Sequence, residues 1–214
     1  MILIDFFTGK LRKLLYKIVS KRTYDKKQDV LDYLTKCGVE TKYGYVTLFG
    51  KPIINKVQGA RIIIGKGVVL VSSNDDNGIV YNPAGINHPV MISALVPGSK
   101  IIIGDNVGIS GSSIVATQKV LVGNNSMLGN NTNIYDTDFH CIDPHERLKQ
   151  INVREAKSEP VIIGTNCWIG SSSIVLKGVT IGDNSVIGAM SLVNKNIPNN
   201  VVAAGNPIKV IRNI

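Results

Sequence analysis

Hydrophobic residues follow two different periods along the chain. Over residues 5–36 they recur every three or four positions, which predicts amphipathic helix with a break near residues 23–25. From about residue 60 they recur at every sixth position, and most of them are β-branched. The clearest run is Ile163, Ile169, Val175, Ile181, Ile187 and Val193. An earlier run, with one extra residue in its middle, is Ile103, Ile109, Val115, Val122, Leu128 and Ile134.

A period of six matches neither a helix nor a simple amphipathic strand, and it indicates a hexapeptide β-helix. Each unit forms one flat face, three faces close a triangular coil, and the apolar residue of each unit points inward. The fourth position of the units supports this interpretation, because it holds asparagine, which tolerates the positive φ of a tight corner. These corner residues are Asn106, Asn125, Asn131, Asn166 and Asn184.

The two periods predict three parts of the chain. A helical segment over residues 1–50 precedes a β-helix over residues 51–205, and residues 206–214 form a cap that is a short helix or a strand. Residues 135–160 interrupt the period and contain two histidines and two prolines. Insertions in a solenoid are loops on one face and often carry the functional site. We therefore expect the active site in this long loop.

The charge of the chain is uneven. The formal net charge is +9, which favours anionic partners. A basic helix over residues 10–27 suits peripheral contact with an anionic membrane surface, although a solvated face is the simpler interpretation. Without interleaved aromatic residues or a known motif, this segment predicts no nucleic-acid partner. Its basic residues are Lys10, Arg12, Lys13, Lys17, Lys21, Arg22, Lys26 and Lys27.

Cysteine usage and hydropathy indicate the cytoplasm. Cys37, Cys141 and Cys167 are an odd number of widely spaced cysteines without a CxxC motif, which favours a reducing compartment. No run of about 18 apolar residues is present that could span a membrane. The charged residues that follow Phe7 argue against the apolar core of a signal peptide.

Four stretches of the sequence resemble the hexapeptide-repeat acetyltransferases, in particular the branch that O-acetylates sugars of surface polysaccharides. They are NHPVM at 87–91, DTDFH at 136–140, the repeats at 166–193, and AAGNPIKVI at 203–211. The resemblance covers roughly residues 60–214. It implies a left-handed β-helix, acetyl-CoA as co-substrate, direct transfer without an acyl-enzyme, and a homotrimer with its sites between neighbouring subunits.

The resemblance implies that His140 is the general base. A sugar hydroxyl is a poor nucleophile until its proton is accepted, and histidine is suited to accept it near neutral pH. Asp136 or Asp138 would orient the imidazole and stabilise its cation. If the segment is extended, strand alternation puts residues 136, 138 and 140 on one side. The competing interpretation of His140 is a surface-loop histidine without a catalytic role.

Four further residues are candidates for binding the acceptor. Asn87 and His88 lie in the NHPVM segment, which in similar sequences is part of the acceptor pocket; the alternative is a turn before Pro89. Arg147 would hold an acceptor hydroxyl or carboxylate, or it simply solvates the loop. The resemblance places Trp168, the sole tryptophan, beside the catalytic histidine as a wall of the pocket between subunits, and core or interface packing is compatible with that.

The C-terminal coils carry the cofactor signal. Small side chains there let a pantetheine arm lie against the stacked coils, and basic residues supply charge for the phosphates. For the small residues, plain repeat structure is the alternative. The residues matching family positions of the CoA groove are Ser171, Ala189, Asn194, Lys209 and Arg212, and Lys195 adds a further positive charge.

Three alternative functions stay open from the sequence. The same histidine would serve N-acetylation of an amino sugar. His88, His140 and His145 would hold zinc in a site resembling the γ-class carbonic anhydrases, although Pro144 and an irregular loop separate the last two. A non-catalytic scaffold is the third possibility. We expect no metal, and the sequence does not name the acceptor sugar.

Overall fold

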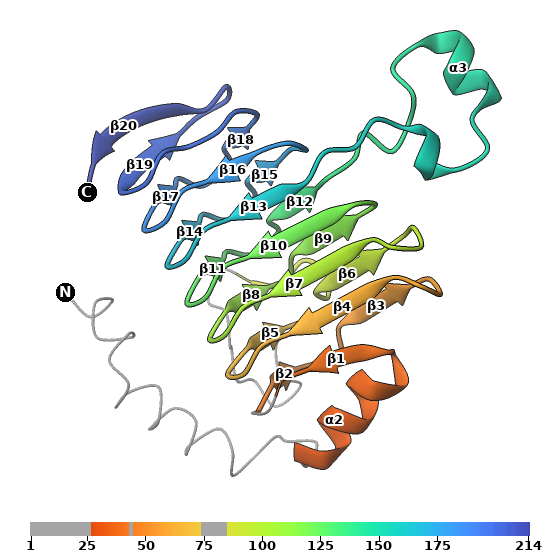
Figure 1. Cartoon of the computed structure of the whole chain (residues 1–214). Helices are drawn as coiled ribbons and strands as arrows, with labels where there is room; N and C mark the ends of the chain where they lie inside the picture. The colour runs from red at the N-terminus through yellow and green to blue at the C-terminus, as the bar shows by residue number, and fades with distance from the viewer. Residues whose placement is uncertain (1–26, 43–44, 74–84) are drawn as a thin grey trace.

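The computed structural model describes residues 27–42, 45–73 and 85–214. These residues form a prism of parallel β-sheets, in which the chain runs along one face after another and adds one strand to each sheet with every turn (Figure 1). We name the three faces sheet A, sheet B and sheet C, in the order in which the chain visits them. The predicted left-handed parallel β-helix is confirmed.

Neighbouring strands pair in parallel in all three sheets, except that β19 and β20 are antiparallel. Sheet A contains β1 (Val39–Thr41), β4 (Arg61–Ile64), β7 (Lys100–Ile103), β10 (Lys119–Val122), β13 (Val161–Ile163) and β16 (Thr180–Ile181). Sheet B contains β2 (Thr47–Phe49), β5 (Val69–Val71), β8 (Gly108–Ser110), β11 (Met127–Leu128), β14 (Trp168–Ile169), β17 (Val186–Ile187), β19 (Val201–Ala204) and β20 (Lys209–Asn213). Sheet C contains β3 (Ile53–Lys56), β6 (Met91–Ala94), β9 (Ser113–Ala116), β12 (Asn133–Tyr135), β15 (Ile174–Val175) and β18 (Leu192–Val193).

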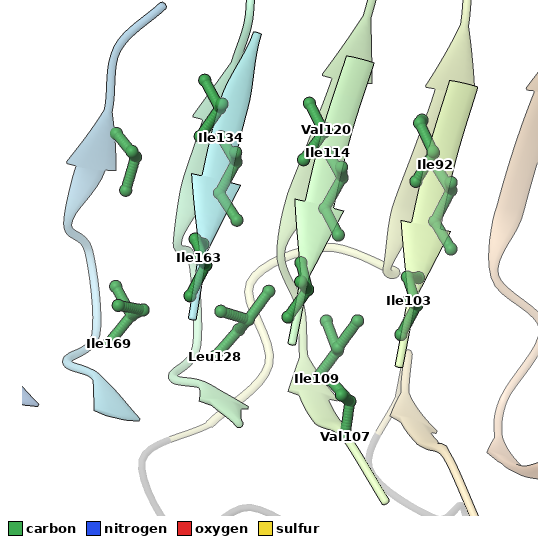
Figure 2. Packing of buried hydrophobic residues seen from close by; sticks show 14 of the residues in the cluster. Ile92, Ile103, Val107, Ile109, Ile114, Val120, Leu128, Ile134, Ile163 and Ile169 are labelled. Carbon is green, nitrogen blue, oxygen red and sulfur yellow. The ribbon is translucent and has the colours of Figure 1, made fainter. Parts of the chain in front are cut away.

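Columns of branched side chains fill the interior of the prism. In sheet C, Ile92, Ile114 and Ile134 lie in register on successive strands, and all three are fully buried. Adjacent members of a column are one strand spacing apart, about 4.8 Å, so each side chain packs against the next. Sheets A and B supply equivalent columns; Figure 2 labels Ile103 and Ile163 from sheet A, and Ile109, Leu128 and Ile169 from sheet B.

The earlier predicted run is wrong at one position. Val115 is only half-buried on the outer side of β9, whereas its neighbour Ile114 is fully buried. Ile114 follows the inward Ile109 by five positions instead of six, and Gly111, with a φ of +44°, makes the shorter corner between them. Pairing across the sheet therefore decides the register, and the period alone misplaces it by one residue.

The corners of the prism match the sequence prediction. All five predicted asparagines have a positive φ, between 57° and 59°. Several of them also hydrogen-bond from coil to coil. Nδ2 of Asn166 donates to Oδ1 of Asn184 over 3.0 Å, and Nδ2 of Asn184 donates to Oδ1 of Asn200 over 2.9 Å. Each of these corner residues thus accommodates left-handed backbone and links neighbouring coils.

Replacement of a corner residue is expected to destabilise the prism. Asn184→Ala places a Cβ in left-handed backbone and removes two side-chain hydrogen bonds, so the free energy of unfolding should fall by about 1–3 kcal/mol. Asn184→Gly is the matched control, because glycine tolerates the φ and loses only the hydrogen bonds. Denaturant unfolding would measure both variants, and an alanine variant as stable as the wild type would contradict the assignment.

The ends of the described chain close the two ends of the prism. The helix α2 (Lys27–Lys36) packs Val30 and Leu34 into the core beside β1, which agrees with part of the predicted helix. Residues 5–26 of that prediction, which include all of the basic segment except Lys27, lie outside the described residues. The prism begins at Val39 and not at residue 51, because β1 and β2 pair with β4 and β5 although they lack the hexapeptide pattern. The C-terminal cap is the strand β20.

No helix within the described residues is both long and apolar enough to cross a membrane.

Candidate active site

Two edges of the prism carry most of the predicted functional residues. We call the edge where sheet C leads into sheet A the CA edge; it includes residues 95–99, 117–118, 136–160, 176–179 and 194–196. The BC edge, where sheet B leads into sheet C, includes residues 85–90, 111–112, 129–132, 170–173 and 188–191. The long loop at 136–160 leaves the CA edge between β12 and β13 and projects away from the prism (Figure 1).

The loop has a defined conformation that polar contacts maintain. It contains the short helix α3 (Pro144–Lys149) and the 3₁₀ turn η2 (Val153–Glu155), each with an N-terminal side-chain cap. Gln150 links its arms, since Nε2 donates to the Phe139 carbonyl (2.8 Å) and Oε1 accepts from the Cys141 N–H (2.8 Å). Thr137 and Ser158 form an antiparallel bridge where the loop leaves the prism. These contacts position the segment that holds His140.

His140 lies at a sharp turn of the loop and is exposed to solvent. Its N–H donates to the carbonyl of Asp138 over 2.7 Å, which closes a three-residue turn around Phe139. Phe139 has a φ of +61°, an unfavourable conformation for an aromatic residue, and strained backbone of this kind occurs often at functional sites. Its ring packs edge-on against Tyr135 at 5.1 Å between centroids. The segment is therefore not extended, so the condition under which residues 136, 138 and 140 would share one side is not met.

Tyr135 supports this turn from the end of β12. Burial raises the pKa of its phenol, so the hydroxyl stays protonated and donates to Oδ1 of Asn133 over 2.8 Å. The hydrogen bond to Asn133 thus fixes the position of the Tyr135–Phe139 pair relative to the prism.

Asp136 has a structural position that differs from its predicted role. It is fully buried, and its carboxylate accepts the backbone N–H groups of Thr117, Gln118 and Lys119, each over 2.7 Å. Both oxygens are thus occupied in shaping the corner of the preceding coil. Of the two predicted aspartates, only Asp138 keeps an oxygen available for the imidazole.

Asp138 bonds to a residue that the sequence analysis did not single out. Its Oδ1 lies 2.6 Å from Nζ of Lys177, and its N–H donates to the carbonyl of Lys157 over 3.0 Å. Its Oδ2 is buried and has no hydrogen-bond partner among the described residues. The one sequence signal for Lys177 is its register: it follows β15 at the CA edge, one coil beyond the loop.

Asn87 and His88 lie on the BC edge, away from the loop. Nδ1 of His88 lies 2.8 Å from the Pro89 carbonyl, and Nε2 lies 3.2 Å from Oδ1 of Asn131, a corner residue of that edge. Asn87 is exposed. Within one chain these two residues and His140 are on different edges of the prism, so a single copy does not bring them together.

Arg147 and Trp168 also differ in setting. Nη1 of Arg147 donates to the carbonyls of Cys141 and Ile142 over 3.0 and 2.9 Å, so the guanidinium braces the loop next to His140. Trp168 lies on β14 in register with Met127 and Val186, and 52% of it is exposed on the outer face of sheet B. A lone copy therefore presents the indole to solvent, on the face opposite the CA edge.

Some of the predicted cofactor residues lie on the BC edge and sheet B, and the others lie on the CA edge. Ser171 and Ala189 lie at successive corners of the BC edge, and Lys209 and Arg212 lie on β20 at the end of sheet B. Asn194 and Lys195 follow β18 at the CA edge. Stacking at the BC corners is tight: a Cβ added to Gly170 would meet the backbone nitrogen of Ala189 at 2.5 Å. The predicted cofactor residues therefore lie on two different sides of the prism.

Comparisons with known proteins decide the family. A profile described as "Hexapeptide repeat of succinyl-transferase" matches residues 160–193. The putative acetyltransferase YJL218W of Saccharomyces cerevisiae is 38% identical over 204 residues, which cover 94% of this chain and 92% of the yeast protein. The chain belongs to the hexapeptide-repeat acetyltransferase family.

Two further relatives of this acetyltransferase have named acceptors. The galactoside O-acetyltransferase of Escherichia coli is 46% identical over 118 residues, which are 55% of this chain and 56% of that protein, so the match spans about half of each. The crystal structure of a maltose O-acetyltransferase from Clostridium difficile 630 superposes with a TM-score of 0.55 and 27% identity, covering 96% of this chain and 85% of the other.

The geometry of the acetyltransferase does not favour the zinc alternative. His88 and His140 lie on different edges of the prism, and His145 is in the first turn of α3. Across residues 27–42, 45–73 and 85–214, no three histidine, cysteine, aspartate or glutamate side chains are grouped so that they could hold a metal ion. Cys37, Cys141 and Cys167 are free thiols.

Proposed function

We propose that this acetyltransferase transfers an acetyl group from acetyl-CoA to a hydroxyl of a sugar in surface polysaccharide biosynthesis. The observation that carries the proposal is His140, exposed at the strained turn of the DTDFH segment, in a loop braced by its own polar contacts. The acetyltransferase family supports the reaction type. The names of the galactoside and maltose O-acetyltransferases support a sugar hydroxyl as the acceptor.

The reaction we propose is direct transfer within a ternary complex. The imidazole of His140 accepts the acceptor's hydroxyl proton as the oxygen attacks the thioester carbonyl carbon. The tetrahedral oxyanion is stabilised by N–H donors, then collapses, and the carbon–sulfur bond breaks. The sulfur of CoA leaves with the proton that His140 had accepted. No acyl-enzyme forms.

We further propose that the site is completed only between copies, in a homotrimer. His140, Asn194 and Lys195 belong to the CA edge, whereas Trp168, Ser171, Ala189, Lys209 and Arg212 lie on the BC edge and sheet B. A thioester held along the BC edge and sheet B of one copy would face His140 only if another copy supplied the CA edge. Cyclic assembly of three copies would bring each CA edge to the B side of a neighbour. Asn87 and His88, also on the BC edge, would then contact the acceptor.

A panel of acceptors tests the reaction. The purified protein would be incubated with acetyl-CoA and free, nucleotide-linked or lipid-linked sugars, and thiol release would be measured. We expect acceptor-dependent release with hydroxyl sugars, and preference for an amino sugar would instead favour N-acetylation. A protein that binds no CoA in calorimetry and releases no thiol with any acceptor would be a scaffold. Stoichiometric zinc in the purified protein would revive the metal alternative.

Lys209 is expected to contribute to cofactor affinity and not to chemistry. Lys209→Ala should raise the KM for acetyl-CoA roughly tenfold with little change in kcat, because a charged hydrogen bond to a phosphate contributes roughly 1.5–3 kcal/mol. Lys149→Ala is the matched control, since Lys149 is an equally exposed lysine at the end of α3. Steady-state kinetics at varied acetyl-CoA would measure both. A change in kcat alone would contradict the binding role.

The acceptor's location is part of the same proposal. The reaction would take place in the cytoplasm, and a lipid-linked acceptor would lie near the membrane surface that the basic segment at 10–27 suits. Acceptor preference in the panel would separate this arrangement from a freely diffusing sugar.

A further inference from the structure

The ion pair between Lys177 and Asp138 is the most sheltered one in the described part of the chain. Nζ and Oδ1 are 2.6 Å apart, and the two side chains are 20% and 25% exposed. The pair between Arg61 and Glu40 is as short, but both of its side chains are about half exposed. Ion pairs in water contribute little because solvent screens them, whereas sheltered pairs constrain geometry more strongly.

The stacking of coils places Lys177 beside the residues at which the loop at 136–160 joins the prism. Ile134 of β12 pairs with Val175 of β15, so the residues that follow these strands meet at the CA edge. The next residue, Gly178, donates its N–H to the carbonyl of Glu159 over 3.0 Å, and the N–H of Glu159 donates to the carbonyl of Asp136 over 2.9 Å. The prism thus fixes both ends of the loop and the position of Lys177 together.

Asp138 has one oxygen that is used and one that is not. Oδ1 bonds to Lys177, while Oδ2 is buried without a hydrogen-bond partner in the described chain, an arrangement that costs free energy. The turn at Phe139 folds the backbone so that the N–H of His140 bonds the carbonyl of Asp138. The turn thus places His140 two residues beyond Asp138, with its side chain exposed to solvent.

We propose that Lys177 is a positioning residue for the reaction. It holds Asp138 by Oδ1, so that Oδ2 is directed to accept the N–H of the His140 imidazole when the ring turns inward on substrate binding. The opposite ring nitrogen is then left free for the acceptor's hydroxyl proton. This inference rests on the proposed role of His140 as the base and names the residue that orients it.

Lys177 also sets the charge that the imidazole experiences. Other charged groups of this region have partners of their own. Nζ of Lys157 lies 3.1 Å from Oε1 of Glu159, and the carboxylate of Asp136 is bound by backbone N–H groups. The guanidinium of Arg147, next to His140, donates to the carbonyls of Cys141 and Ile142. A carboxylate without a counter-ion favours the protonated form of an imidazole beside it, and a neighbouring ammonium opposes that effect. We therefore expect removal of the Lys177 charge to alter the pH profile of the reaction.

The decisive variant is Lys177→Met, which keeps an unbranched side chain of nearly the same length and removes its charge. We expect kcat to fall roughly 10- to 100-fold, the usual effect of losing an orienting partner, while the KM for acetyl-CoA changes less than about twofold. The acid limb of the kcat/KM profile should move to higher pH, because the imidazole then holds its proton more tightly. Lys177→Arg should restore most of kcat and the original profile.

Asp138→Asn provides an independent readout with the opposite sign. It removes the carboxylate charge but keeps a side chain of the same shape, so kcat should fall while the acid limb moves to lower pH. Lys157→Met is the matched control, because it breaks the other ion pair of the same edge, and its rates and profile should equal those of the wild type. Thermal unfolding of every variant reports folding separately from activity.

The outcomes distinguish this inference from the proposed function. If Lys177→Met keeps the wild-type kcat and pH profile while His140→Ala is inactive, the positioning role is wrong and the base assignment stands. A uniform loss of activity with no shift of the acid limb in either Lys177→Met or Asp138→Asn would also overturn it, since only structure would then be affected. If His140→Ala itself stays active, the proposed function fails instead. If Lys177→Met does not fold, Lys177→Gln, which also removes the charge, replaces it in the same measurements.

Discussion

His140→Ala is expected to lower kcat by about 10²- to 10⁴-fold, the usual contribution of a general base. The variant cannot accept the acceptor's proton, so the hydroxyl attacks the thioester only as a weak nucleophile. The KM for acetyl-CoA should change little, because the residues proposed to bind the cofactor lie on other elements. Since His140 is exposed, we expect the melting temperature to equal that of the wild type.

The control for this variant lies in the same loop. His145 is exposed in the first turn of α3, where its backbone N–H and not its ring takes part in capping by Asp143. His145→Ala should therefore keep the wild-type rate. Turnover near that of the wild type in His140→Ala, measured by thiol release, would remove the base assignment.

The second large effect concerns the sharing of one site by two copies. Ala189 is exposed at a tight corner of the BC edge, so Ala189→Arg adds bulk on the outside of the prism without disturbing its core. We expect this variant to be inactive, because the arginine occupies the groove in which the pantetheine arm would lie. We expect His140→Ala to lose activity through the CA edge instead. In the proposed shared site, each of the two variants would still hold one intact half.

Mixed trimers of the two variants are expected to regain about a third of the wild-type activity per trimer. In any cyclic trimer that contains both variants, one interface in three joins the intact CA edge of one copy to the intact B side of the next. Co-expression with two different affinity tags, and purification through both, would isolate such trimers. No activity in the mixed trimers would show that both halves act within one copy. If sedimentation analysis shows a monomer and this monomer acetylates the acceptor, the proposal of a shared site is wrong.

The repeat region was predictable because each residue there has a local reason for its place. Asn106 or Asn184 occupies a corner since its own backbone must adopt a positive φ, and Ile163 or Ile187 points inward since its unit has one buried position. Such preferences act over a few residues and therefore can be read from spacing. The prediction failed at Val115, where a short corner at Gly111 shifts the register by one residue.

The site was predictable only in part. The DTDFH segment pointed to the loop with His140, but it did not reveal that Asp136 is buried or that the chain turns at Phe139. Asp136 binds three consecutive N–H groups of the preceding coil, and Lys177 reaches Asp138 from the following one. Both contacts join residues that are far apart in the sequence, so no local sequence pattern indicates them.

The sequence by itself determined that the chain coils into a three-sided prism. A six-residue period with corner residues that tolerate a positive φ buries the branched side chains only in that arrangement. Only the tertiary structure decided which residues share an edge, since that depends on how coils stack and on where the loop leaves them. Stacking brings Lys177 to Asp138 and separates His140 from Trp168, although His140 and Trp168 are closer together in the sequence than Asp138 and Lys177.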